Sequence, residues 1–180
     1  MLYIHMALGW NPELDVEQLR RDFWSAFGPA GRQVEQYFDY WEAYSLTHPQ
    51  GSLYSPVKAH LAYPPAVFAT QEAVLKKAFA TAASHPLPEF AERVKFLPAG
   101  LEHARLCARF IGTLDQGKVP AQREGFHKAQ QALQELVAFR RAKEHLFIAD
   151  YLDAAAARER RNVKGIDRLF EEFKAKVPAQ

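Results

Sequence analysis

Apolar side chains recur every three or four residues along most of the chain, which is the period of an amphipathic α-helix. Between residues 90 and 111 the spacing alternates between four and three, as in the seam of an antiparallel bundle. The positions are Phe90, Val94, Leu97, Leu101, Ala104, Ala108 and Ile111. No stretch alternates apolar and polar residues as a strand would. The pattern predicts an all-α fold, a bundle of about six or seven helices.

Capping residues and breakers place the helix boundaries. Asp15 has the position of an N-cap, and Gln18 completes the spacing of a capping box. Thr70 is the expected N-cap of a later helix, and the two prolines of His85-Pro86-Leu87-Pro88 are expected to break the chain after it. Pro98 is expected to kink or split the helix in which it falls. The helix from residue 121 is predicted to be the longest uninterrupted one, with a pattern that extends towards residue 151. A last apolar set indicates a final helix: Val163, Ile166, Leu169, Phe170 and Phe173.

The least regular stretch is residues 52–65, which contains three prolines. Four of its side chains are suited to hydrogen-bond a sugar or a carboxylate: Tyr54, Lys58, His60 and Tyr63. Loops carry binding groups more often than cores do, so these four are the candidate substrate-binding residues. The structural alternative, which we favour, is a surface connection held in place by its tyrosines.

Aromatic residues follow one face of the helix predicted over residues 30–47. Tyr37, Tyr40, Trp41 and Tyr44 recur at intervals of three and four. Such a ladder can stack on a sugar ring, but aromatic side chains are also ordinary filler of cores and interfaces. We favour the packing role.

Composition narrows the class of protein. Of 180 residues, 48% are hydrophobic and 24% are charged, as in a soluble globular domain. The net charge of +2 argues for neither a nucleic-acid nor a membrane partner. No apolar run approaches the roughly 20 residues of a membrane span. The start lacks the features of a signal peptide, so a cytoplasmic location is the default expectation.

The residues offer little chemistry. None of the seven histidines has another histidine three or four positions away, so no two-histidine helix face for zinc is present. Cys107, the single cysteine, lies on or beside an apolar stripe, and a buried inert thiol is expected. Carboxylates are scattered over polar faces. We therefore expect no catalytic residue, no metal site and no cofactor in this chain.

One stretch near the N-terminus has a more specific sequence than the formation of helices and turns requires. Tyr3-Ile4 leads through Leu8 to Trp10-Asn11-Pro12-Glu13-Leu14-Asp15, and a helix ending near Phe27 is followed by Gly28-Pro29-Ala30. This resembles a junction in bacterial glycoside-hydrolase-like proteins whose architecture is related to α-glucuronidases and β-hexosaminidases. In that family, an apolar helix at the end of a (β/α)8 barrel passes through such a turn into a C-terminal helical domain.

The resemblance implies an organisation and a role. Residues 1–14 would correspond to the end of an upstream barrel, and residues 15–180 would form a single helical domain. The catalytic residues would lie on the barrel, which makes this chain a non-catalytic accessory or interface domain of a carbohydrate-active protein. The expected partners are that barrel or a second subunit, with a carbohydrate as a further candidate. The expected interface residues are Tyr3, Ile4, Leu8 and Trp10.

Two alternatives remain open from the sequence. In the first alternative, the chain is a stand-alone helical protein-interaction module, and its N-terminal similarity is coincidental. In the other it is a small enzyme that uses the 52–65 loop, with His60 beside Tyr54 and Tyr63.

Overall fold

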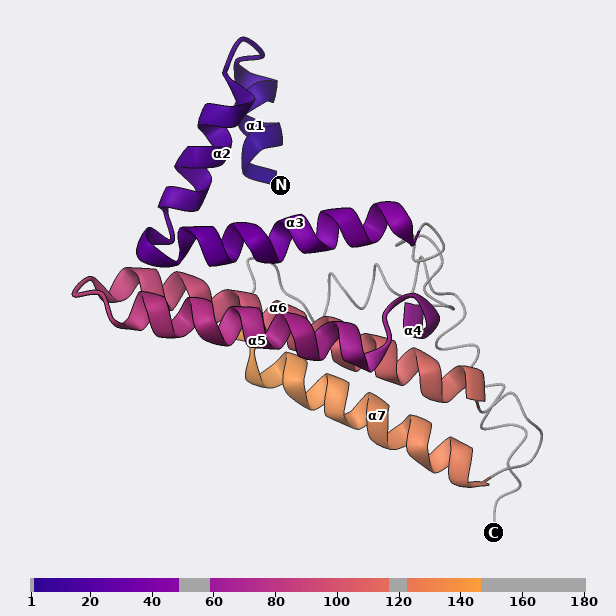
Figure 1. Cartoon of the computed structure of the whole chain (residues 1–180). Coiled ribbons are helices and arrows are strands. Elements are labelled where there is room, and N and C mark those ends of the chain that lie inside the picture. Colours follow the sequence, from indigo (N-terminus) through magenta and orange to yellow (C-terminus); the bar gives the residue numbers. More distant parts are fainter. Residues whose placement is uncertain (1, 49–58, 117–122, 147–180) are drawn as a thin grey trace. The chain divides into compact units, whose positions relative to one another are not determined.

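The computed structural model describes residues 2–48, 59–116 and 123–146. All regular secondary structure in these ranges is helical. No strand occurs within these ranges, which confirms the predicted all-α bundle (Figure 1). The α-helices are α1 (Leu2–Trp10), α2 (Val16–Ser25), α3 (Gly31–Thr47), α4 (Ala59–Ala62), α5 (Pro65–Ala83), α6 (Pro88–Gln116) and α7 (Arg123–Ala142). Two short 3-10 helices are η1 (Gly28–Ala30) and η4 (Glu144–Leu146).

The described residues divide into two compact units. The first contains residues 2–44 and 69–98, so it holds α1, α2, most of α3 and α5, and the start of α6. The second contains the described residues between 45 and 68 and those from 99 onwards. The boundary in α6 falls directly after Pro98. The helix nevertheless continues through this proline, so it is not split there.

Local signals explain where α2 begins. Asp15 is its N-cap in extended backbone, and its carboxylate accepts hydrogen bonds from the backbone N–H groups of Glu17 and Gln18. This confirms the predicted cap. The Gln18 amide donates to Asp22 at 2.7 Å, one turn further on, in place of the return bond of a capping box.

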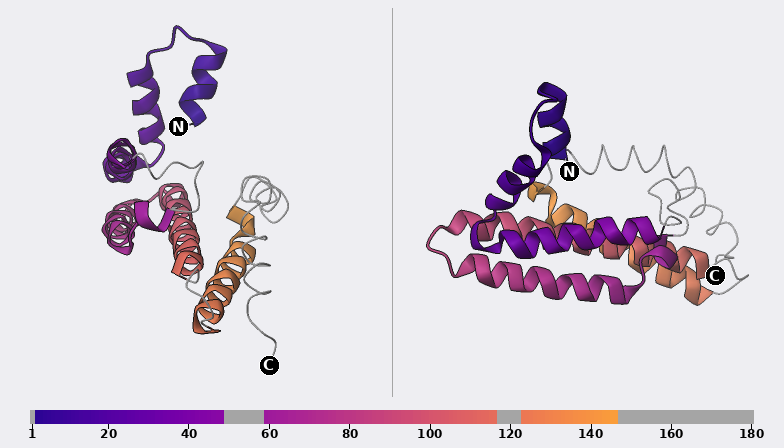
Figure 2. Two further views of the ribbon diagram at one scale, coloured as in Figure 1. Left: turned by 90° about the vertical axis from the view of Figure 1, so that its right-hand side faces the viewer. Right: turned by 45° about the horizontal axis from the view of Figure 1, so that its top comes forward.

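Proline sets the start of two later helices. Pro65 is the first residue of α5, so the prediction that Thr70 caps this helix is wrong. Proline suits a first helical position because its φ is already fixed and its missing N–H would have no partner there. Pro88 begins α6 in the same way, and the predicted break between α5 and α6 is confirmed. Figure 2 shows the two helices side by side on either side of this turn.

The predicted seam of α6 is correct in part. Val94, Leu101 and Ala108 are buried, but Ala104 is exposed. Beyond residue 101 the helix buries a further set of positions, Leu106 and Phe110, against α7.

Helix lengths also differ from the prediction. The longest described helix is α6 with 29 residues, whereas α7 has 20 and ends at Ala142. The short η4 follows it. The predicted final helix, residues 163–173, lies outside the described residues, and so does the extension to residue 151.

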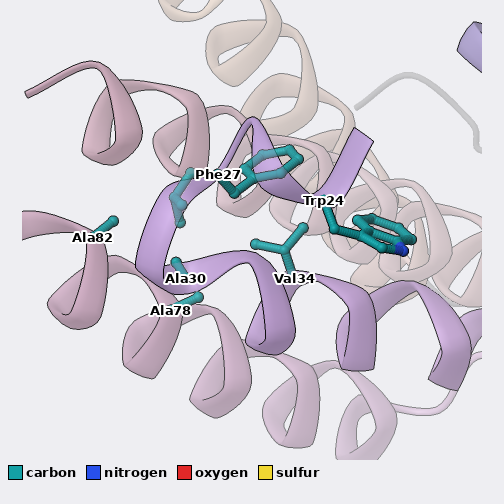
Figure 3. Packing of buried hydrophobic residues seen from close by; sticks show 7 residues of the cluster. Trp24, Phe27, Ala30, Val34, Ala78 and Ala82 are labelled. Carbon is teal, nitrogen blue, oxygen red and sulfur yellow. The ribbon is translucent and has the colours of Figure 1, made fainter. Parts of the chain in front are cut away.

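The core of the first unit is built from α2, η1, α3, α5 and α6. Seven buried residues form it: Trp24, Phe27, Ala30, Val34, Ala78, Ala82 and Val94. Figure 3 shows the Trp24 ring beside Val34 of α3, and Ala30 of η1 next to Ala78 of α5. Alanine at the contact positions lets the two helices approach closely, and Trp24 and Phe27 close the layer.

The glycines beside this core have steric reasons to be there. Gly28 has a φ of +54°, and a Cβ at this position would lie 2.5 Å from the ring of Phe90. At Gly31 a Cβ would lie 2.6 Å from the backbone oxygen of Trp24. The Gly-Pro-Ala step and the glycine after it thus form a tight corner between the end of α2 and the start of α3.

The second unit has a core of its own between α6 and α7, which lie side by side in Figure 2. Its buried members are Leu106, Phe110, Ala129, Ala132 and Leu136.

Candidate functional site

Helix α1 packs against α2 along one face only. Ile4 is buried and Leu8 is half-buried on this face. The Tyr3 ring stacks on Phe23 of α2 with 5.9 Å between ring centroids, and Phe23 in turn packs edge-on against Trp24 of the first core. The helices run in opposite directions through the turn after Trp10 (Figure 1).

A second face of α1 is apolar and more exposed, with Tyr3 at its edge because one side of the Tyr3 ring is covered by Phe23. Tyr3, Met6 and Trp10 follow one another at the spacing i, i+3, i+7 and are 45%, 67% and 93% exposed. We call these three residues the exposed stripe. Two further exposed apolar side chains, Leu14 and Val16, follow in the turn and at the start of α2. Apolar side chains grouped in this way are typical of a protein interface.

The four predicted interface residues therefore have different environments. Tyr3 and Trp10 lie on the exposed stripe, whereas Ile4 and Leu8 pack towards α2. Met6 was not among the predicted interface residues, although its helical spacing from Tyr3 and Trp10 places it on the same face of α1. The helix is apolar on both faces, and sequence periodicity alone does not show which face finds a partner within the chain.

The structure describes two of the four candidate binding residues of the 52–65 stretch, His60 and Tyr63. Tyr54 and Lys58 lie outside the described residues. His60 is half-buried on α4, and its Cβ lies 3.2 Å from where a Cβ on Gly112 would be. The Tyr63 ring packs against Phe68 with 6.5 Å between centroids. Both described side chains thus pack within their own unit, as expected of a surface connection that its side chains hold in place.

The aromatic ladder of α3 is continuous. Tyr37 is buried, and Tyr40, Trp41 and Tyr44 are half-buried. The Tyr40 and Tyr44 rings are stacked at 5.7 Å, and each packs edge-on against Trp41. Burial raises the pKa of the Tyr37 hydroxyl above its usual range.

A polar cluster missed by the sequence reading joins α6 to α7. Arg140 is buried, and its Nε–H donates to His103 Nε2 at 3.1 Å. Because a guanidinium only donates, this histidine nitrogen supplies the lone pair. The Cys107 sulfur lies 3.6 Å from the same nitrogen and packs beside the second core. Arg140 is distant from His103 in sequence, so no local pattern indicates the contact.

Within the described ranges, no group of three or more His, Cys, Asp or Glu side chains is arranged to hold a metal ion. None of the helices in these ranges combines the length and the apolar character needed to cross a membrane.

Comparisons with protein-family models, curated proteins and solved structures found no significant match to this chain.

Proposed function

We propose that this chain is a non-catalytic accessory domain whose exposed stripe forms an interface with another protein surface. The observation that carries the proposal is the environment of α1. This helix has no Asp, Glu, Lys or Arg, packs one face on α2, and leaves Met6, Trp10 and part of Tyr3 exposed.

The size of the surface supports this role. The exposed stripe presents on the order of 300–400 Å² of apolar surface, given the areas of aromatic and aliphatic side chains. Patches of this size are among the largest on monomeric proteins and often have a function. Met, Tyr and Trp are also residue types enriched in the centres of interfaces.

The parent protein is proposed from the N-terminal sequence. The Trp10-to-Asp15 turn and the Gly28-Pro29-Ala30 step resemble the junction of glycoside-hydrolase-like proteins, so we place the domain in a carbohydrate-active protein of that architecture. A stand-alone interaction module would use the same surface. The two readings differ in whether the coding sequence upstream of Met1 encodes a (β/α)8 barrel in frame. Sequencing that region tests the parent assignment.

The interface itself is tested with anilinonaphthalene sulfonate, a dye that fluoresces on apolar protein surfaces. We expect the wild-type chain to bind the dye and the variant Met6→Glu/Trp10→Glu to lose most of the signal. Leu46→Glu is the matched control, because Leu46 is 78% exposed on α3 and its loss leaves the stripe intact. Equal dye binding by all three proteins would refute the proposal.

A further inference from the structure

We propose that the contact between His103 and Arg140 is an acid-sensitive latch, which holds α7 against α6 while His103 is neutral and weakens when this ring gains a proton. The latch lies within the second unit and is independent of the exposed stripe. It follows from the hydrogen bond between the two side chains, the burial of the guanidinium and the place of the contact beside the second core.

The hydrogen bond requires one protonation state of the ring. Arg140 Nε–H donates to His103 Nε2 at 3.1 Å. A guanidinium only donates, so Nε2 must supply a lone pair, whereas both nitrogens of a protonated imidazole are donors. The contact therefore forms only when His103 is neutral.

Burial makes the loss of this contact costly. Arg140 is 7% exposed although it carries a full charge, and His103 is half-buried. A proton on His103 would remove an acceptor from the buried guanidinium and place a second positive charge beside it. Folding thus favours the neutral ring. The stabilisation is present at neutral pH and is lost as pH falls below the ordinary imidazole value of about 6.5.

The groups that face this ring come from both helices. On α6, the Cys107 sulfur lies 3.6 Å from His103 Nε2, and a second guanidinium nitrogen of Arg140 donates to this sulfur at 3.8 Å. The ion pairs of the same stretch are more exposed: Glu102 with Arg105 on α6, and Arg109 of α6 with Glu135 of α7. Arg140 is thus the cation that a proton on His103 would meet.

The latch lies beside the contact that joins the two helices. Leu106 of α6 and Leu136 of α7 belong to the second core, and Arg140 follows Leu136 by one helical turn. Helix α7 ends two residues later, at Ala142. Loss of the latch is therefore expected to free the C-terminal end of α7 first.

Urea unfolding of the full chain at several pH values tests the latch. His103→Gln is the informative variant, because the glutamine side-chain oxygen accepts from Arg140 and does not titrate. As pH falls from about 8 to about 5, we expect the unfolding equilibrium constant to rise about 10-fold more in wild type than in His103→Gln. His127→Gln is the matched control, because His127 is exposed on α7 and its loss leaves the latch intact.

Two further measurements locate the effect. Hydrogen exchange, corrected for the intrinsic rate at each pH, should show α7 losing protection relative to α5 as pH falls, in wild type but not in His103→Gln. In an NMR titration of the wild-type chain, which depends on no variant, the His103 ring should take up its proton at a lower pH than the ring of His127.

Three results would each overturn the latch. The first is an unfolding profile that His103→Gln leaves unchanged or that His127→Gln flattens equally. The second is a His103 ring that titrates together with His127 or at higher pH. The third is protection of α7 that does not depend on pH.

Discussion

The tight corner between α2 and α3 makes Gly31→Ala a sharp test of the fold. A Cβ at Gly31 would lie 2.6 Å from the backbone oxygen of Trp24 and 3.3 Å from its carbonyl carbon. The contact is difficult to relieve, because it involves backbone. The same oxygen accepts a hydrogen bond from the N–H of Phe27 at 3.1 Å, which fixes the turn after α2.

The magnitude follows from two opposing effects. Alanine gains at most about 1 kcal/mol over glycine in a helix, and less at the first residue of one. Forcing extra volume into a packed site costs about 1–3 kcal/mol, and the backbone contact at Gly31 places this site at the upper end. We expect Gly31→Ala to lower the free energy of unfolding by about 1–2 kcal/mol, or Tm by about 2–8 °C for a chain of this length.

Gly100→Ala is the matched control. Gly100 lies inside α6, and a Cβ there would meet nothing within 4 Å. We expect this variant to gain about 0.5–1 kcal/mol. Both are measured by urea unfolding followed by circular dichroism. If Gly31→Ala were as stable as Gly100→Ala, the start of α3 would not lie this close to the backbone of Trp24.

Three further predictions concern single side chains. Asp15→Ala removes the cap of α2 and should cost about 1 kcal/mol in urea unfolding, while Asp15→Ser should retain most of it; equal losses would argue against the cap. Leu75→Ala opens a cavity at a position that is 1% exposed and should cost about 2–5 kcal/mol, whereas Leu46→Ala on the surface should change stability by less than about 0.5 kcal/mol. Because burial raises the pKa of Tyr37, folding favours its neutral form, and this contribution is lost as pH rises above the unfolded-state pKa near 10. Between pH 9 and about 11.5, the free energy of unfolding should therefore fall more in wild type than in Tyr37→Phe, by at most about 1.4 kcal/mol per pH unit. If the free energies of the two proteins ran parallel over this pH range, the burial of Tyr37 would be refuted.

Local chemistry was readable from the sequence. The cap at Asp15, the Gly-Pro step at Gly28 and the proline-rich break before Pro88 depend on neighbouring residues, so their spacing was enough to predict them. The helical period predicted the all-α class for the same reason. Thr70 misled because a good cap residue also occurs inside helices, and Pro65 begins the helix five residues earlier.

Tertiary features were less accessible. The exposure of Ala104 and the burial of Leu106 depend on where α7 packs, which a periodic pattern does not specify. The contact of Arg140 with His103 joins two helices and has no local signature. For α1, the sequence showed an apolar helix but did not separate Ile4, which packs on α2, from Met6, which is open. The stripe needed a structure to be recognised.

Hydroxyl-radical footprinting tests most directly whether the exposed stripe is open on the surface of the chain, as the proposed interface requires. Oxidation of Met6 and Trp10 in dilute protein is read by mass spectrometry and corrected for the intrinsic reactivity of each residue type. Leu46 and the buried Trp24 serve as references for an exposed and a protected side chain. We predict that Met6 and Trp10 are as open to oxidation as Leu46. Protection of both stripe residues to the level of Trp24 would contradict the account.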